Sequence, residues 1–292
     1  NEVLAIVLPL PLLTALAAAM VAVVRSWARR RDILDHPNQR SSHVAPTPRG
    51  GGVGIVLVSL LGWSLLPAFG MAFDRALWGV LAAAVVIAAG SWWEDVTQSV
   101  AAPVRLAIHL AAAILALVVM GPPDQIALPW LGERSLSLWA TPLVLLWMVG
   151  MTNASTFMDG IDGIAGGQAA AAGLAWCVVG ILADAPLLAA SGGILAATSL
   201  GFLVYNWPPA QIFMGDVGST FLGFTFAALA VASAAVDPRL PLAGLLTLWP
   251  FVFDTGFTLC RRAVRGENVL AAHRSHLYQR LVISGWSHRA VS

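Results

Sequence analysis

The chain has 292 residues, of which 58% are hydrophobic and only 11% are charged, a balance that a water-exposed protein surface would not tolerate. Its formal net charge of +1 argues against a nucleic-acid partner, which would require a concentrated basic surface. All 16 basic side chains are Arg, and the absence of Lys excludes Schiff-base chemistry.

Apolar runs long enough to cross a hydrocarbon layer of about 30 Å recur along the whole sequence. Such runs must satisfy their own backbone hydrogen bonds, so we predict helical spans. They cover residues 3–24, 53–73, 76–93, 105–121, 140–156, 163–183, 187–205, 218–236 and 241–260. The predicted fold class is an all-α polytopic membrane protein of about nine to eleven transmembrane helices. We expect one catalytic domain over residues 1–292, with room for a further terminal helix outside them.

The distribution of arginine predicts how the chain is oriented in the membrane. One group of Arg flanks the first and last spans, at positions 25, 29, 30, 31, 40, 49, 261, 262, 265, 274, 280 and 289. The connections on the opposite side hold only Arg75, Arg134 and Arg239. Because positive residues gather on the cytoplasmic side, we expect the N-terminus outside and the C-terminus in the cytoplasm. One outer connection, residues 124–138, alternates apolar and polar residues, which predicts a small β-hairpin at the outer surface.

The first cytoplasmic connection ends in a glycine-rich motif, Arg49-Gly50-Gly51-Gly52, directly before a span. Consecutive glycines let backbone N–H groups approach an anion at a helix N-terminus. The Arg49 guanidinium can add charge-assisted hydrogen bonds to phosphate oxygens. A positively charged topology determinant with a glycine hinge explains this loop equally well.

Acidic residues recur where later spans meet the cytoplasm. Glu94 and Asp95 end one span, and boundary carboxylates are functional candidates, although a solvated helix end is the commoner explanation of a single pair. Asp159 and Asp162, each followed by Gly, are the strongest local signal. Three residues apart, their carboxylates point the same way if the segment is helical. A polar turn between spans is the less favoured alternative.

The last two cytoplasmic connections add a candidate metal residue and two histidines. Asp216 lies between glycines at the start of a span, which suits a carboxylate that holds Mg²⁺ beside phosphate. A helix N-cap explains that aspartate equally well, and its place in the chain favours function. His273 and His276 lie in a basic tail, where anion binding is favoured over zinc because no Cys accompanies them. A lipid-headgroup patch is the alternative for this tail.

In this order and on one side of the membrane, the motifs resemble those of the polyprenyl-phosphate N-acetylhexosamine-1-phosphate transferases, from Asp35 to about His276. The resemblance implies transfer of a sugar 1-phosphate from a UDP-sugar to polyprenyl (undecaprenyl) phosphate, with release of UMP. It implies Mg²⁺, with Mn²⁺ as the alternative, as the charge-neutralising cofactor. It also implies a multi-pass protein of the bacterial inner membrane with a cytoplasmic active site, and it leaves a homodimer open.

The resemblance assigns roles to individual residues. The residues it implies as catalytic are Glu94, Asp95, Asp159 and Asp162. Asp216 takes the principal metal position, and Asp95 joins it as a metal residue. The residues it implies for substrate binding are Arg49, Gly50, Gly51, Gly52, Asn153, Asn206, His273 and His276.

Two departures from the family pattern affect the acidic and asparagine motifs. Relatives usually have Asp-Asp where this chain has Glu94-Asp95, so the carboxylate chemistry survives with a longer reach. Thr156 stands where many relatives place a second Asn. The form of the first loop and the spaced histidines are closer to the O-antigen and teichoic-acid branch than to the phospho-N-acetylmuramoyl-pentapeptide transferases.

Other classes of membrane protein compete with this interpretation. A transporter for an anionic lipid or nucleotide also needs charged residues inside a helical bundle, but it places them near the midplane. Here the motifs lie on one side only, which favours an enzyme. A CDP-alcohol phosphatidyltransferase would gather its aspartates in one compact segment, whereas this chain spreads them over several connections.

Overall fold

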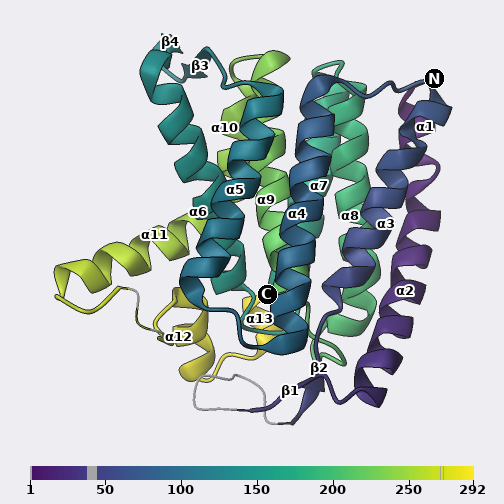
Figure 1. Ribbon diagram of the computed structural model, residues 1–292, viewed down its shortest axis with the longest axis vertical. Coiled ribbons are helices and arrows are strands. Elements are labelled where there is room, and N and C mark those ends of the chain that lie inside the picture. The colour runs from purple at the N-terminus through teal and green to yellow at the C-terminus, as the bar shows by residue number, and fades with distance from the viewer. Residues whose placement is uncertain (1, 38–44, 270, 272) are drawn as a thin grey trace.

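The computed structural model describes residues 2–37, 45–269, 271 and 273–292 (Figure 1). Its α-helices are α1 (Glu2–Val7), α2 (Leu10–Arg30), α3 (Gly52–Leu65), α4 (Arg75–Thr97), α5 (Ala102–Met120), α6 (Ala140–Met158), α7 (Ile164–Leu182), α8 (Pro186–Asn206), α9 (Asp216–Ala232), α10 (Leu240–Thr247), α11 (Trp249–Val264), α12 (Leu277–Ile283) and α13 (His288–Val291). The strands are β1 (Leu34–Asp35), β2 (Thr47–Pro48), β3 (Gln125–Leu128) and β4 (Gly132–Ser135). Short 3₁₀ segments are η1 (Leu66–Phe69), η2 (Ser137–Trp139) and η3 (Ser233–Ala235).

The long helices confirm the predicted all-α membrane class. Within the described residues, seven helical segments are long and apolar enough to span a bilayer, or eight if the bent pair α10 and α11 counts as one. The predicted span 140–156 forms α6, whose polar C-terminal half lowers its hydropathy. Each of the nine predicted spans therefore has a helical counterpart, although by length and hydropathy the count stays below nine to eleven.

The last predicted span, 241–260, is not a straight crossing. It breaks between α10 and α11 with a bend of 68°. Pro250 stands in the first turn of α11, where its missing N–H is tolerated and continuation of the preceding helix is not. Beyond the break, α11 leaves the bundle sideways (Figure 1).

The predicted outer hairpin is present as β3 and β4. These strands pair antiparallel, with Gln125 opposite Ser135. The hairpin lies at the same end of the bundle as the N-terminus, whereas β1, β2, α12 and α13 lie toward the opposite end (Figure 1). The small β1–β2 ladder, which was not predicted, pairs Leu34 with Pro48 and Asp35 with Thr47.

Helix α9 runs through the middle of the bundle, and nearly all of its residues are buried. The adjacent α7 and α8 pack closely because both carry small residues at their contact. A Cβ on Gly173 of α7 would lie 2.6 Å from the backbone nitrogen of Ala196 on α8. Such close contacts between small residues are typical of membrane helices, which pack by shape rather than by a hydrophobic driving force. The bundle thus fixes α9, whose first residue is Asp216, in its centre.

Candidate active site

Asp95 closes the N-terminus of the central helix. Its Oδ1 accepts from the backbone N–H of Asp216 (3.0 Å) and its Oδ2 from that of Val217 (2.9 Å). The Nη2 of Arg49 donates to the same Oδ1 at 2.7 Å, and the Asp95 side chain is 0% exposed. The two oxygens of Asp95 therefore accept hydrogen bonds from the first N–H groups of α9 and from Arg49. These bonds satisfy backbone donors that have no partner within the helix. These contacts give Asp95 a structural role at the start of α9, and its predicted role as a metal ligand stays a prediction.

Glycines make this arrangement possible. Gly215 has a φ of +77°, and a Cβ there would lie 2.6 Å from Asp95 Oδ2. A Cβ on Gly52 would collide with Gly218, so α3 and α9 start in direct backbone contact. These glycines are required for close approach between segments that are far apart in sequence.

Two N–H groups of the glycine-rich motif, which was predicted to bind phosphate, are engaged within the protein. The N–H of Gly51 donates to the Phe213 carbonyl (2.9 Å) and that of Gly52 to the Met214 carbonyl (2.8 Å). Groups bonded in this way are not free to cradle an anion. The motif instead ties the first cytoplasmic connection to the segment before Asp216. Arg40 lies outside the described residues.

Arg105, at the start of α5, links two of the predicted acidic residues. Its Nη1 lies 3.4 Å from Asp216 Oδ2 and 3.7 Å from Glu94 Oε1. The other Glu94 oxygen accepts from the backbone N–H of Val100 at 2.8 Å, which closes the turn between α4 and α5. The Arg105 side chain is 40% exposed, so its charge can reach a ligand outside the helices. The sequence predicted Arg105 only as the first residue of a span, and no functional role was predicted for it.

Asp159 follows the last residue of α6 and is partly buried. Burial raises the pKa of Asp159 well above its ordinary value, and the carboxylates of Asp216 and Asp95 raise it further. Asp159 therefore lies close enough to Asp216 and Asp95 for electrostatic repulsion between the carboxylates. The predicted acidic motifs from three connections do come together at one end of the bundle.

Asp162 and Asn206 hold the neighbouring loops. Asp162 Oδ2 accepts from the backbone N–H of Ala210 (3.1 Å) and lies 3.3 Å from His288 Nδ1. The Asn206 side chain accepts from Gly163 N–H (2.9 Å) and donates to the Ile212 carbonyl (2.9 Å). Asn206 thus uses both ends of its buried amide on backbone, and its predicted substrate contact stays a prediction. His288 was not singled out from the sequence.

The two predicted histidines form a second cluster beside the Asp159 turn. Their ring centroids are 5.0 Å apart, and the His276 ring stacks on Phe157 at 6.2 Å. The Tyr278 hydroxyl donates to the Phe157 carbonyl at 2.9 Å. Asn153 lies deeper on α6, where its side chain donates to the Val149 carbonyl at 2.7 Å. The predicted substrate-binding role of Asn153 stays a prediction.

The donor set near Asp216 fits a hard divalent cation held partly by substrate. Among the described residues, no group of three or more His, Cys, Asp or Glu is arranged to hold a metal by itself. Mg²⁺, however, usually takes one or two carboxylates and completes its shell with phosphate oxygens and water. Burial is the largest cause of the raised pKa of Asp159, and the charge of Asp216 adds to it, so the two carboxylates lie near each other. Asp216 and Asp159 are thus carboxylates of the kind that such an ion takes.

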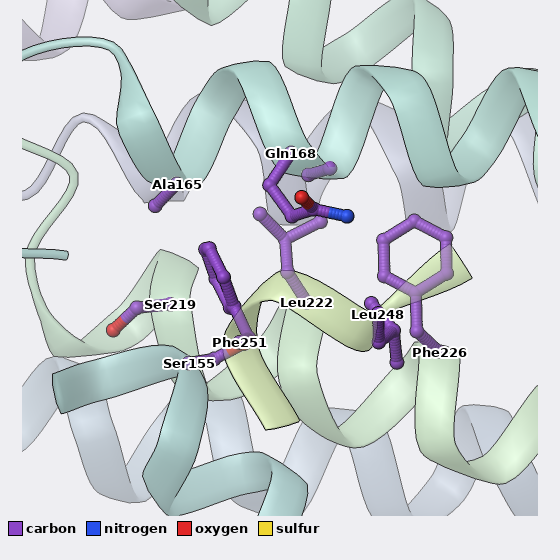
Figure 2. Close-up of a pocket in the computed structure, with 9 residues that line it drawn as sticks. Ser155, Ala165, Gln168, Ser219, Leu222, Phe226, Leu248 and Phe251 are labelled. Carbon is purple, nitrogen blue, oxygen red and sulfur yellow. The ribbon is translucent and has the colours of Figure 1, made fainter. Parts of the chain in front are cut away.

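An apolar pocket adjoins this site inside the bundle (Figure 2). Its lining comes from α6, α7, α9 and the α10–α11 break, and comprises Ser155, Ala165, Gln168, Ala169, Ser219, Leu222, Phe226, Leu248 and Phe251. Ser219 lies one helical turn beyond Asp216. The pocket therefore extends from the charged end of α9 toward the apolar interior.

Comparison with known proteins places the chain among membrane glycosyl transferases. A family model described as glycosyl transferase family 4 matches residues 77–234. A probable undecaprenyl-phosphate N-acetylglucosaminyl 1-phosphate transferase of Bacillus subtilis is 32% identical over 91% of this chain and 74% of the relative. A decaprenyl-phosphate N-acetylglucosaminephosphotransferase of Mycobacterium leprae is 32% identical over 96% and 77%. A phospho-N-acetylmuramoyl-pentapeptide-transferase of a Synechococcus strain is 27% identical over 93% and 82%.

Proposed function

The chain belongs to glycosyl transferase family 4, and from that premise we propose that it transfers an N-acetylhexosamine 1-phosphate from a UDP-sugar to polyprenyl phosphate. The products are a polyprenyl-diphospho-sugar and UMP. Two relatives at 32% identity carry N-acetylglucosamine in their names, which favours UDP-N-acetylglucosamine as the donor over a muramoyl-pentapeptide nucleotide.

The observation that carries the proposal is the meeting of Asp216, Asp159 and Arg105 at one end of an apolar bundle. In the reaction, an oxygen of the lipid phosphate bonds to the phosphorus that carries the sugar, and the bond from that phosphorus to the UMP oxygen breaks. Catalysis of such a transfer consists mainly of positioning and charge stabilisation. The Arg105 guanidinium lies 3.4 Å from Asp216 Oδ2 with its side chain 40% exposed, so it would supply positive charge for the phosphate oxygens.

No strong base is required in this scheme. A phosphate monoester has a second pKa of about 6, so the attacking lipid phosphate is already largely ionised at neutral pH. Glu94 is engaged by Val100 and lies near Arg105, which suits a residue that holds Arg105 in place. We assign Glu94 an accessory role and Asp95 a positioning role.

When bound, Mg²⁺ would neutralise the charge of the donor diphosphate and polarise its oxygens. Asp216 and Asp159 are the residues of this chain that would hold it. Asp95 and Arg49 fix the start of α9, and with it the place of Asp216.

The acceptor would reach the site from the membrane. The pocket beside Ser219 is lined mainly by apolar side chains, among them Leu248 and Phe251 at the α10–α11 break (Figure 2). The first isoprenoid units fit such surroundings by their chemistry, while the lipid phosphate stays at the charged end. We place this end on the cytoplasmic face of the bacterial inner membrane, because most of the Arg residues lie there.

The direct test is UMP release by purified protein given undecaprenyl phosphate and a panel of UDP-sugars. We expect UMP from UDP-N-acetylglucosamine, only when both lipid phosphate and Mg²⁺ are present. No UMP from any donor in the panel, from protein that melts cooperatively, would refute the proposed function.

A further inference from the structure

Asp254 lies outside the acidic site, on α11, and is almost wholly buried. Its Oδ1 accepts from the backbone N–H of Leu277 (2.9 Å) and from the Thr258 hydroxyl (3.1 Å), and lies 3.1 Å from His276 Nδ1. Its Oδ2 accepts from the backbone N–H of Tyr278 at 3.1 Å. One carboxylate therefore joins α11 to the start of α12 and to a histidine.

The contact with Asp254 determines the state of the His276 ring. A carboxylate whose oxygens already accept three other hydrogen bonds can only accept, so Nδ1 of His276 must carry the hydrogen. Nε2 is then the ring nitrogen on the side away from Asp254. The ring is held on its sides by Phe157 and Tyr278, at centroid distances of 6.2 and 5.9 Å.

The helix that carries Asp254 also holds the rest of the basic loop. The Arg262 guanidinium on α11 donates to the carbonyls of Asn268 (2.6 Å) and Ala271 (3.1 Å). Arg261 donates to the carbonyl of Ser275, the residue before His276. The loop is therefore fastened to α11 at several points, and Asp254 is the point that contacts its imidazole.

The same segment packs directly on the turn that carries Asp159. The Tyr278 hydroxyl bonds to the Phe157 carbonyl, and a Cβ on Gly160 would collide with that hydroxyl. His276 therefore stacks on Phe157 while its neighbour Tyr278 contacts Phe157 and Gly160, the residues that flank Met158 and Asp159. A cap for α12 alone would need only a neutral acceptor such as Ser or Asn, whereas a buried carboxylate also fixes the imidazole.

We propose that Asp254 is a positioning residue that fixes the tautomer and orientation of His276, so that His276 Nε2 contacts a diphosphate oxygen of the nucleotide donor. The inference rests on the proposed function, because that function supplies the diphosphate. In this arrangement Nδ1 of the imidazole bonds to Asp254, and Nε2 bonds to the donor diphosphate.

The test compares UDP binding, measured by calorimetry on purified protein with Mg²⁺, among three single variants. Asp254→Asn removes the anchoring charge. His276→Asn keeps an N–H near the Nδ1 position for Asp254 and removes Nε2. Thr258→Val is the matched control, since it loses one hydrogen bond to Asp254 but leaves the His276 contact. We expect UDP affinity to fall roughly tenfold or more in the first two variants, the loss typical of a hydrogen bond to a charged group.

Two further measurements separate positioning from simple stabilisation. The double variant Asp254→Asn/His276→Asn should bind UDP no more weakly than His276→Asn alone, because both changes remove the same contact. In these variants the KM for undecaprenyl phosphate should stay within about twofold of wild type, so that the loss is specific to the nucleotide donor. A merely structural defect would instead lower the fraction of active protein and leave the UDP affinity of that fraction unchanged.

Wild-type UDP affinity in the His276→Asn variant would overturn the inference, even if Asp254→Asn fails to fold. Additive losses in the double variant would also overturn it. UMP release by the wild type is read separately. A wild type that binds UDP through His276 but releases no UMP would refute the proposed function and still support the His276 assignment.

Discussion

Asp216 and Glu94 share Arg105 as a neighbour, but their other contacts differ. Glu94 is engaged by the Val100 N–H, whereas Asp216 stands at the first turn of α9 with an oxygen toward Arg105. We therefore expect Asp216→Asn to abolish UMP release, by ~10³-fold or more, while Glu94→Gln loses ~10-fold. Besides holding Arg105, Glu94 is at most an accessory base, so the loss in Glu94→Gln should shrink as pH rises and the lipid phosphate becomes fully ionised.

The measurement for both variants is a pH profile of initial UMP release, at equal amounts of folded protein. Asp216→Glu is the matched control for charge, because it keeps the carboxylate and changes only its reach. A pH-independent collapse of Glu94→Gln, as deep as that of Asp216→Asn, would instead make Glu94 an essential ligand. Near-normal turnover of Asp216→Asn would reduce Asp216 to a helix cap.

Asp159 carries a stability cost that depends on pH. Its pKa is raised in the folded protein, chiefly by burial. Above that pKa the side chain is ionised in both states, and the buried carboxylate of the folded state is less favourable than the solvated one of the unfolded state. Below the folded-state pKa, Asp159 is protonated in the folded protein but still ionised in the unfolded chain. The stability lost at high pH is therefore regained as pH falls toward the ordinary Asp pKa of about 4. We therefore expect Asp159→Asn, in chelator, to melt higher than wild type at pH 8, by about 2–4 °C for each kcal/mol gained.

This advantage of Asp159→Asn should disappear between pH 8 and pH 4. Added Mg²⁺ should then stabilise the wild type more than the variant, since only the wild type keeps the second carboxylate. A variant less stable than wild type at pH 8 would mean that the Asp159 carboxylate is favourably paired and that the sign argued here is wrong. Differential scanning fluorimetry across the pH series provides the measurement.

Single residues also show where sequence patterns stop being informative. The acidic motifs were predictable, because carboxylates at the cytoplasmic ends of apolar spans are conspicuous. The division of labour between Asp95 and Asp216 was not, since it depends on a hydrogen bond between residues 121 positions apart. His288 was missed for the same reason: nothing in its local sequence indicates that it meets Asp162.

At the scale of whole elements, α7 and α8 show how much the bundle depends on small residues. A methyl group on Gly173 would press against backbone atoms of Ala196 and Gly192. Gly150, in the middle of α6, has nothing within 4 Å of the equivalent position. We expect Gly173→Ala to destabilise the protein by ~1–3 kcal/mol through overpacking, whereas Gly150→Ala should be neutral or gain up to ~1 kcal/mol from helix propensity.

Both alanine variants change a helix-interior glycine in the same way, so propensity cancels in the comparison. Melting in one detergent, with UMP release as a check on folding, measures the difference. Equal melting temperatures for the two variants would show that α7 and α8 are not in the close contact described here.

The break between α10 and α11 was partly readable from the sequence. Pro250 lies inside the predicted span 241–260, and a proline there commonly kinks or ends a helix. The kink itself follows from chemistry, but its angle of 68° and the sideways course of α11 depend on packing against the bundle. The apolar runs located a helix for each predicted span, but they left the direction of this one undetermined.

For the molecule as a whole, the two ends of the bundle differ in charge and in chemistry. The end with β1, β2 and α12 carries the acidic site and most of the Arg residues, and the opposite end carries the N-terminus and the β3–β4 hairpin (Figure 1). A transporter would place such charges near the midplane, within reach of both sides. Family membership and the one-sided site together favour a transferase.

The orientation in the membrane gives the last prediction. Arginines concentrate at the site end, and the positive-inside rule therefore predicts that this end faces the cytoplasm. Ser284, after α12, and Ser135, on the hairpin, are both exposed and lie at opposite ends. In a background with Cys177 and Cys260 replaced by Ala, a membrane-impermeant maleimide added to intact cells should label Ser135→Cys and spare Ser284→Cys. Permeabilised cells, in which both must react, control for accessibility, and the reverse pattern in intact cells would place the active site on the outer face and exclude a cytosolic donor.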